Sequence, residues 1–237
     1  MDRRVEYTWY GQVKGEALEK NIDSKLAAVK KHILEMGGFV EKALMQACQS
    51  MEMRDISGFG KVHEIEKRIN EAQMQVDNEC LNILATQGPV AKDLRFIMSI
   101  LKINTDLERM GDLSVNIAYS GKDFLNYNLS IGIKELNRMS VLVRDMVGQS
   151  LDSFVKADQE LAQKILLQDD EVDYIRDIID GELIKHMKSH PQDVEPCMHL
   201  LSISRNLERL GDHATNIAED VIFAFSGRDI RHGGRFG

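Results

Sequence analysis

Two stretches of the chain share one pattern and decide how the rest of it folds: L-E-R-M-G-D-L-S-V-N-I-A at residues 107–118 and L-E-R-L-G-D-H-A-T-N-I-A at residues 207–218. Between residues 101–118 and 201–218, ten of eighteen positions are identical at a constant offset of 100 residues. Roughly one identity is expected by chance, so the chain contains an internal duplication. We therefore expect two similar structural units.

Each copy places acidic and amide side chains along one face of a helix, because a spacing of four residues returns to the same side. The residues at this spacing are Glu108, Asp112 and Asn116 in the first copy, with Glu208, Asp212 and Asn216 in the second. Two like charges so placed cost a helix roughly 0.2–0.5 kcal/mol, and the interior glycines Gly111 and Gly211 cost about 1 kcal/mol each. A pattern that carries these costs twice predicts a compensating role in packing or binding.

The composition favours a helical protein over a β-rich or disordered one. Charged residues make up 29% of the chain and hydrophobic residues 43%, with 3 prolines and 6% aromatic residues. The length of 237 residues allows one large domain or two smaller units, and the duplication favours two.

Charge and cysteine content exclude several classes of function. The formal net charge is −8 and the basic residues are scattered, so we expect no nucleic-acid binding. Three dispersed cysteines, Cys48, Cys80 and Cys197, do not suit a disulfide framework or a thiolate metal site. The sequence shows neither an apolar run long enough to span a membrane nor a signal-peptide pattern. We expect a soluble protein of the cytosol.

Apolar residues recur at helical spacing over six segments. The expected helices cover residues 21–53, 57–88, 89–125, 131–155 and 158–189, and a sixth runs, after a turn at 190–193, through the second motif to about Phe225. Candidate caps are Asp55, Ser57, Ser130 and Asp158. Gly11 and Gly15 argue against a firm helix before Glu16.

Three helices in each half predict an all-α fold of two tandem, pseudo-symmetric antiparallel three-helix bundles. We expect the first repeat at residues 16–126 and the second at 128–226. Residues 1–15 then form an N-terminal segment, and residues 227–237 form a tail expected to be disordered.

The middle helix of each half offers further polar side chains at helical spacing. They are Glu66, Asn70, Gln73 and Asp77 in the first half, with Asp169, Asp173, Arg176 and Asp180 at an offset of 103 in the second. An antiparallel middle helix can turn this face toward the motif helix, where several carboxylates repel one another unless a cation intervenes. Magnesium, manganese, iron and zinc ions accept such oxygen ligands.

The alternative is an ordinary solvated helix face. Asp112 can pair with Arg109, and Asp212 with Arg209, at i,i+3 spacing without any metal. Gly111 and Gly211 also have a packing explanation, which we favour for both, because a helix glycine lets a neighbouring element approach closely.

No residue is assigned a catalytic role. His213 follows Asp212 and is a candidate auxiliary ligand, although a lone histidine is more often a hydrogen-bonded surface residue. The motifs lack the Glu-x-x-His pattern of di-iron bundles, and the chain has no phosphate-binding loop or nucleophile elbow.

At these residues the chain resembles the PhoU family of phosphate-uptake regulators. The matching features are the doubled L-E-R-x-G-D-x-x-x-N-I-A, the segment P-V-A-K-D-L-R at 89–95, and the acidic segments E-K-R-I-N at 66–70 and D-D-E-V-D at 169–173. The resemblance implies two three-helix bundles, often assembled as a homodimer. It also implies a cytoplasmic, non-enzymatic accessory protein of the phosphate-specific ABC transporter, which restrains uptake and signals to a sensor histidine kinase. Such a protein meets the membrane only through its partners.

The resemblance further implies metal ions, iron or zinc in some members, at the Glu-x-x-x-Asp motifs. Carried over, the ligands are Glu108, Asp112, Glu208 and Asp212, with Glu66, Asp77, Asp169, Asp173 and Asp180 from the middle helices. Auxiliary candidates are Asn70, Asn116, Asn216 and His213. Because Asn70 and Gln73 replace acids in the first half, we expect the second bundle to hold metal at least as well as the first, although Arg176 offsets part of that advantage.

The competing hypothesis is a metal-dependent hydrolase that uses the carboxylate clusters to activate water. It requires a concave pocket beside the metal, whereas an adaptor requires only shallow clusters on exposed bundle faces.

Overall fold

The computed structural model describes residues 3–129, 131 and 133–230, and the regular elements in this part of the chain are all helical. The helices are α1 (Arg3–Glu52), α2 (Gly58–Gln87), α3 (Ala91–Phe124), α4 (Ile133–Lys156), α5 (Gln159–Ser189) and α6 (Val194–Ser226), with a short 3-10 helix, η1 (Pro191–Asp193), before the last of them. The predicted all-α class is confirmed, and the six helices follow the expected order.

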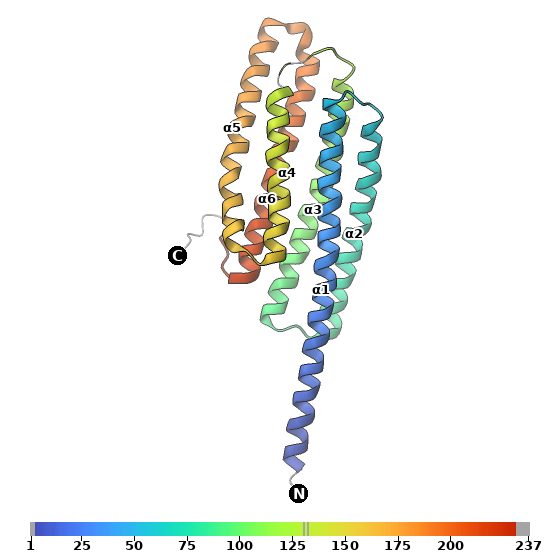
Figure 1. The fold of residues 1–237 in the computed structure, drawn as a ribbon, viewed down its shortest axis with the longest axis vertical. Coiled ribbons are helices and arrows are strands. Elements are labelled where there is room, and N and C mark those ends of the chain that lie inside the picture. Colours follow the sequence, from blue (N-terminus) through green and yellow to red (C-terminus); the bar gives the residue numbers. More distant parts are fainter. Residues whose placement is uncertain (1–2, 130, 132, 231–237) are drawn as a thin grey trace.

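The helices form two antiparallel three-helix bundles that lie side by side (Figure 1). The first bundle consists of α1, α2 and α3, and the second of α4, α5 and α6. Helices α3 and α6 run antiparallel and pack along each other at the centre of the molecule, and α1 also contacts α4. Helices α2 and α5 each contact only members of their own bundle among the six helices.

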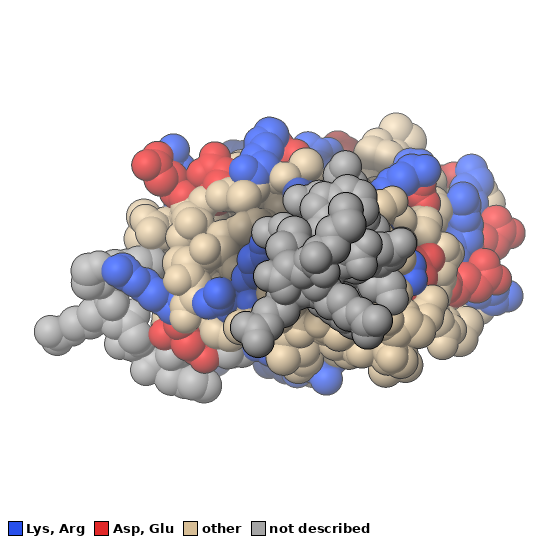
Figure 2. Space-filling view, turned by 90° about the horizontal axis from the view of Figure 1, so that it is seen from below, with Lys and Arg blue, Asp and Glu red and all other residues tan. Residues whose placement is uncertain are grey.

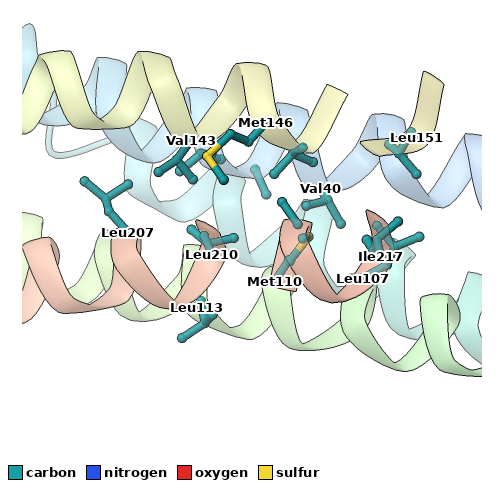
Figure 3. Close-up of a cluster of buried hydrophobic side chains, with 14 of the residues drawn as sticks. Val40, Leu107, Met110, Leu113, Val143, Met146, Leu151, Leu207, Leu210 and Ile217 are labelled. Carbon is teal, nitrogen blue, oxygen red and sulfur yellow. The ribbon is translucent and has the colours of Figure 1, made fainter. Parts of the chain in front are cut away.

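One apolar core runs through both bundles. Figure 3 shows its central part, where Val40 of α1, Met110 of α3, Met146 of α4 and Leu210 of α6 point toward one another. All four side chains are fully buried. Because the apolar stripes of the four inner helices meet in one place, burial that stabilises one bundle also holds it against the other.

Close packing of α1 against α4 depends on Gly37. A Cβ atom at this position would overlap the buried Leu151 side chain of α4, whereas one at Gly38 would meet nothing within 4 Å. Absence of a side chain at Gly37 therefore lets the two helices approach.

Only some of the residues expected to cap the helices do so. The Asp158 side chain caps α5 by accepting from the Leu161 N–H at 3.0 Å, as expected. Asp55 accepts from the Ser57 N–H and hydroxyl, so it orders the turn before α2, whereas the Ser57 side chain itself makes no capping bond. The remaining expected cap, Ser130, lies outside the described residues.

The first helix is longer than expected. It begins at Arg3, so the expectation that Gly11 and Gly15 prevent a helix before Glu16 was wrong. A helix that is already nucleated by packing extends at the cost of fixing one residue at a time, and this outweighs a glycine penalty of about 1 kcal/mol. The first turns of α1 project beyond the other helices (Figure 1). Residues 227–230 of the expected tail carry no regular structure, and residues 231–237 lie outside the described part.

Within residues 3–129, 131 and 133–230, no helix combines the length and the apolarity that a membrane crossing requires. Basic and acidic side chains are interspersed on the end of the molecule seen in Figure 2. This view agrees with the scattered charges of the sequence.

The two adjacent glycines of α1 allow a matched test of packing. Replacing either by alanine should gain about 1 kcal/mol of helix propensity. At Gly37 the added methyl must displace Leu151, so we expect Gly37→Ala to be less stable than Gly38→Ala by about 1–3 kcal/mol in urea denaturation. Equal stability of the two variants would contradict the proposed role of Gly37.

Candidate functional site

The two motifs lie on α3 and α6, and each faces the middle helix of its own bundle. Glu108 of α3 is half-buried and Asp112 is exposed, and the negative charge of Glu66 on α2 acts on both carboxyl groups. On the other side, Asp212 of α6 acts on Asp169 of α5. The fold therefore brings the predicted carboxylates of motif helix and middle helix together in both bundles.

The first acidic cluster consists of Glu66, Asn70, Glu108 and Asp112. The Glu66 carboxylate is largely buried and accepts a hydrogen bond from the Asn70 side-chain amide, while the Asn70 Oδ1 atom is buried with no partner. Burial raises the pKa of Glu108, and the negative charges of Asp112 and Glu66 raise it further against the opposing effect of Arg109. Burial and the charge of Glu66 likewise raise the pKa of Asp112.

Positive groups near the first cluster are few among the described residues. His63 Nδ1 lies 3.6 Å from Glu66 Oε2, and Arg109 acts on Glu108 without an ion pair between them. The ion pair between Arg109 and Asp112 that the spacing allows is not formed among the described residues either. The cluster thus gathers carboxylates and an orphan amide oxygen with little internal compensation.

The second acidic cluster consists of Asp169, Asp173, Glu208 and Asp212, with Arg176 among them. Arg176 Nη1 lies 2.7 Å from Glu208 Oε1 and 3.2 Å from Asp173 Oδ1. Burial raises the pKa of Asp169 to about 6, with further contributions from Asp212 and Asp173. Burial and Asp173 raise the pKa of Asp212, whereas His213, Arg176 and Arg209 lower it.

Arg176 makes the two clusters chemically different. Its guanidinium group bridges a motif-helix carboxylate and a middle-helix carboxylate, as a bound cation would. The matching position in the first bundle is Gln73, which carries no charge. This arrangement weighs against the expectation that the second bundle holds metal at least as well as the first.

Asp77 and Asp180 do not join the clusters. Asp77 lies eleven residues beyond Glu66, and Asp180 lies eleven residues beyond Asp169, which is about 16 Å along the helix axis. Asp77 instead accepts a hydrogen bond from the Asn104 side chain at 2.9 Å. The Oδ1 atom of Asp180 is buried without a partner, because the residue matching Asn104 is Ser204, whose hydroxyl points to Met139 Sδ at 3.9 Å.

His213 connects the two bundles instead of completing an acidic cluster. Its Nδ1 atom lies 2.8 Å from Asp106 Oδ1 of α3, and both side chains are about 85% buried. Asn216 lies at the edge of hydrogen-bond distance from the same carboxylate, and Asn116 is exposed. The sequence carries no signal for the Asp106–His213 pair, because both residues fall at positions where the two repeats differ.

The two motif glycines have different surroundings. A Cβ atom at Gly111 would lie 3.0 Å from Ile69 Cδ1, so α2 packs tightly there. At Gly211 the nearest atoms, Val172 Cγ1 and Asp169 Oδ1, would lie at an ordinary 3.6 Å. The packing explanation therefore fits Gly111 better than Gly211.

The carboxylates do not surround a single point as they stand. Among the described residues, no group of three or more His, Cys, Asp or Glu side chains is placed to hold a metal ion. Four hollows of about 110–430 Å³ occur on the described surface, and none of these four is lined by the carboxylates of either acidic cluster. The largest lies in the groove between α3 and α6, beside Asp106 and Arg109.

Fold and site together define a class: all-α proteins of two matching three-helix bundles, each with an acidic Glu-x-x-x-Asp face. The family model described as the PhoU domain matches residues 33–120 and again residues 136–221. The chain therefore belongs to the PhoU family, as its motifs predicted.

Known proteins match over most of this chain. It is 35% identical over 218 residues to the phosphate-specific transport system accessory protein PhoU homolog of Pseudomonas putida, covering 92% of this chain and 85% of that protein. The crystal structure of PhoU from Pseudomonas aeruginosa superimposes with a TM-score of 0.84 at 35% identity, covering 87% of this chain and 99% of that one. The phosphate transport system regulatory protein PhoU from Streptococcus pneumoniae gives a TM-score of 0.81 at 26% identity, covering 88% of this chain and 98% of that one.

The raised pKa of Asp169 makes stability depend on pH. An aspartate whose folded pKa is about 6, against an ordinary 3.8, binds its proton more tightly when folded, so stability falls as pH rises between these values. In chelator-treated buffer we expect Asp169→Asn to be more stable than the parent by on the order of 1 kcal/mol at about pH 7, after allowance for solvent screening of a half-exposed group. The difference should vanish near pH 4.

Urea denaturation at both pH values measures this effect, and Asp23→Asn, at an exposed aspartate of α1, is the control. A stability difference between parent and Asp169→Asn that is independent of pH would refute the raised pKa of Asp169.

Proposed function

We propose that this protein is a cytoplasmic, non-enzymatic regulator of phosphate uptake and phosphate-regulon signalling. It acts as an adaptor that restrains the phosphate-specific ABC transporter through its ATPase subunit and passes the phosphate status to a sensor histidine kinase. The observation that carries the proposal is the family match over both halves of the chain, together with relatives that are named for accessory and regulatory roles in phosphate transport. We also propose that the protein forms a homodimer.

The surface of the bundles supports an adaptor better than a hydrolase. The acidic clusters lie on helix faces where Asp112, Asp173 and Asp212 are exposed, and the four hollows described above are lined by other residues. A hydrolase needs a concave site that encloses its substrate beside the metal.

We further propose that the first acidic cluster binds a metal ion. Its donor set fits a hard or borderline cation such as iron, zinc, manganese or magnesium, because it combines the carboxylates of Glu66, Glu108 and Asp112 with the unpartnered amide oxygen of Asn70. A bound cation would supply positive charge that stabilises the ionised carboxylates. The side chains must close in to complete the site, since they do not surround one point in its absence.

The second acidic cluster would bind metal more weakly, because Arg176 already neutralises part of its charge. A metal ion there must compete with a guanidinium group hydrogen-bonded to Glu208 at 2.7 Å. The proposed order of metal affinity, with the first acidic cluster above the second, is the reverse of our expectation from the sequence.

Paired variants test the order of metal binding. We expect Glu108→Gln/Asp112→Asn to lose more bound zinc or iron than Glu208→Gln/Asp212→Asn, by elemental analysis after equilibrium dialysis. We also expect Arg176→Gln, which copies Gln73, to tighten the second site about tenfold, equivalent to roughly 1.4 kcal/mol. No gain from Arg176→Gln, or greater loss from the α6 double variant, would reject this order.

Removal of the protein from its own cells tests the regulatory proposal. In ample phosphate we expect loss of the gene to raise phosphate uptake and the expression of a phosphate-regulon reporter, and we expect a plasmid copy to restore both. Pull-down with the transporter ATPase and the kinase, with and without chelator, separates metal-dependent from metal-independent contacts. Unchanged uptake and reporter expression in the deletion strain would overturn the proposal.

A further inference from the structure

The corner between α5 and α6 gathers three metal-ligating side chains away from both acidic clusters. His186 lies in the last turn of α5, His190 caps that helix, and Asp193 ends η1 just before α6 begins. Asp193 and Glu208 are fifteen residues apart, about 22 Å along α6, so the corner is separate from the second acidic cluster.

These three side chains are already in contact. His186 Nε2 lies 2.8 Å from Asp193 Oδ2, and the His186 and His190 rings stack with their centroids 4.3 Å apart and their planes at 12°. The His190 N–H donates to the His186 carbonyl oxygen at 2.8 Å and closes the last turn of α5, while the His190 backbone itself, at φ −134° and ψ 74°, has left the helical conformation. Because the two rings stack, both imidazoles lie on the same side of the end of α5.

We propose that His186, His190 and Asp193 form a binding site for a zinc-like divalent cation. Two imidazoles and one carboxylate are a donor set that zinc prefers, with water completing the tetrahedron. Two histidines at i,i+4 on a helix are also the spacing used in known zinc-binding helices. Ligand atoms at about 2.0–2.1 Å from zinc lie about 3.4 Å apart, so the 2.8 Å pair needs only a small displacement.

Binding requires one rearrangement. The three donors form a hydrogen-bonded pair and a ring stack, and they do not surround one point. The exposed His190 ring, whose Nδ1 lies 3.0 Å from Ser189 Oγ, must turn so that one nitrogen faces the space between His186 and Asp193. Zinc then replaces the His186–Asp193 hydrogen bond with a bond to each partner.

The local field favours a cation here. The corner follows the C-terminal end of α5, where unpaired carbonyl groups carry partial negative charge, and Asp193 adds a full one. The exposed Lys185 and Lys188 oppose it, but water screens both side chains. A bound ion would connect the end of α5 to the start of α6, the helix that carries the second motif.

Zinc titration with NMR detection of the histidine ring nitrogens tests the site in the full chain. We expect the His186 and His190 ring signals to shift together. The ring signals of His199, a residue of α6 that lies beside Tyr127, should stay in place. We expect His190→Gln and Asp193→Asn to weaken zinc binding at the corner by at least tenfold, as loss of even a supporting group near a metal does. His199→Gln is the matched control and should bind as the parent does.

Thermal unfolding provides a second measurement, because a ligand that binds only the folded chain raises its Tm. To remove the contribution of the acidic clusters, the zinc-dependent rise is compared between the parent and His190→Gln. Unmoved His186 and His190 signals, or equal zinc affinity of parent and His190→Gln, would overturn the proposal. The histidine ring signals report only on the corner, so a negative result there would leave the metal proposal for the acidic clusters standing. Failure of the acidic clusters to bind metal would likewise leave the corner site standing.

Discussion

The antiparallel packing of α3 against α6 is the contact on which the rest of the structure depends. Each of these helices buries one face in the shared core, through residues such as Met110 and Leu210, and turns another face toward the middle helix of its own bundle. The acidic motifs lie on that second face. The burial that joins the bundles therefore also fixes which carboxylates meet, and it does so at two matching places.

Packing alone brings negatively charged carboxylates close together at both places, and the two bundles compensate this repulsion differently. In the first bundle burial and the negative charge of Glu66 raise the proton affinity of Glu108 and Asp112, with little positive charge nearby. In the second, Arg176 supplies that charge from within the chain. A partly buried group of carboxylates with little internal compensation is the better candidate for a cation from solution, because the ion removes more repulsion there.

Periodicity was sufficient to predict most of the fold, since long amphipathic helices with clear end signals are the elements that a single sequence specifies best. It failed at the N-terminus, where Gly11 and Gly15 were given too much weight against an extending helix. Within the site, the i,i+4 spacing of Glu108 and Asp112 correctly predicted a shared face toward α2. The same spacing does not bring Asp77 and Asp180 into the clusters. Residues eleven positions apart, such as Glu66 and Asp77, share a helix face but lie too far apart along the axis to share a site.

The sequence by itself determined the duplication, the helical class, the helix order and the acidic faces, because these depend on local spacing and on identity between repeats. Only the tertiary structure decided that Arg176 bridges Glu208 and Asp173, that His213 bonds to Asp106 across the bundles, and that His186 meets Asp193 at the α5–α6 corner. Such pairings depend on how helices rotate and approach in three dimensions. The Arg176 bridge in particular gives the two copies of the L-E-R-x-G-D motif surroundings of different charge.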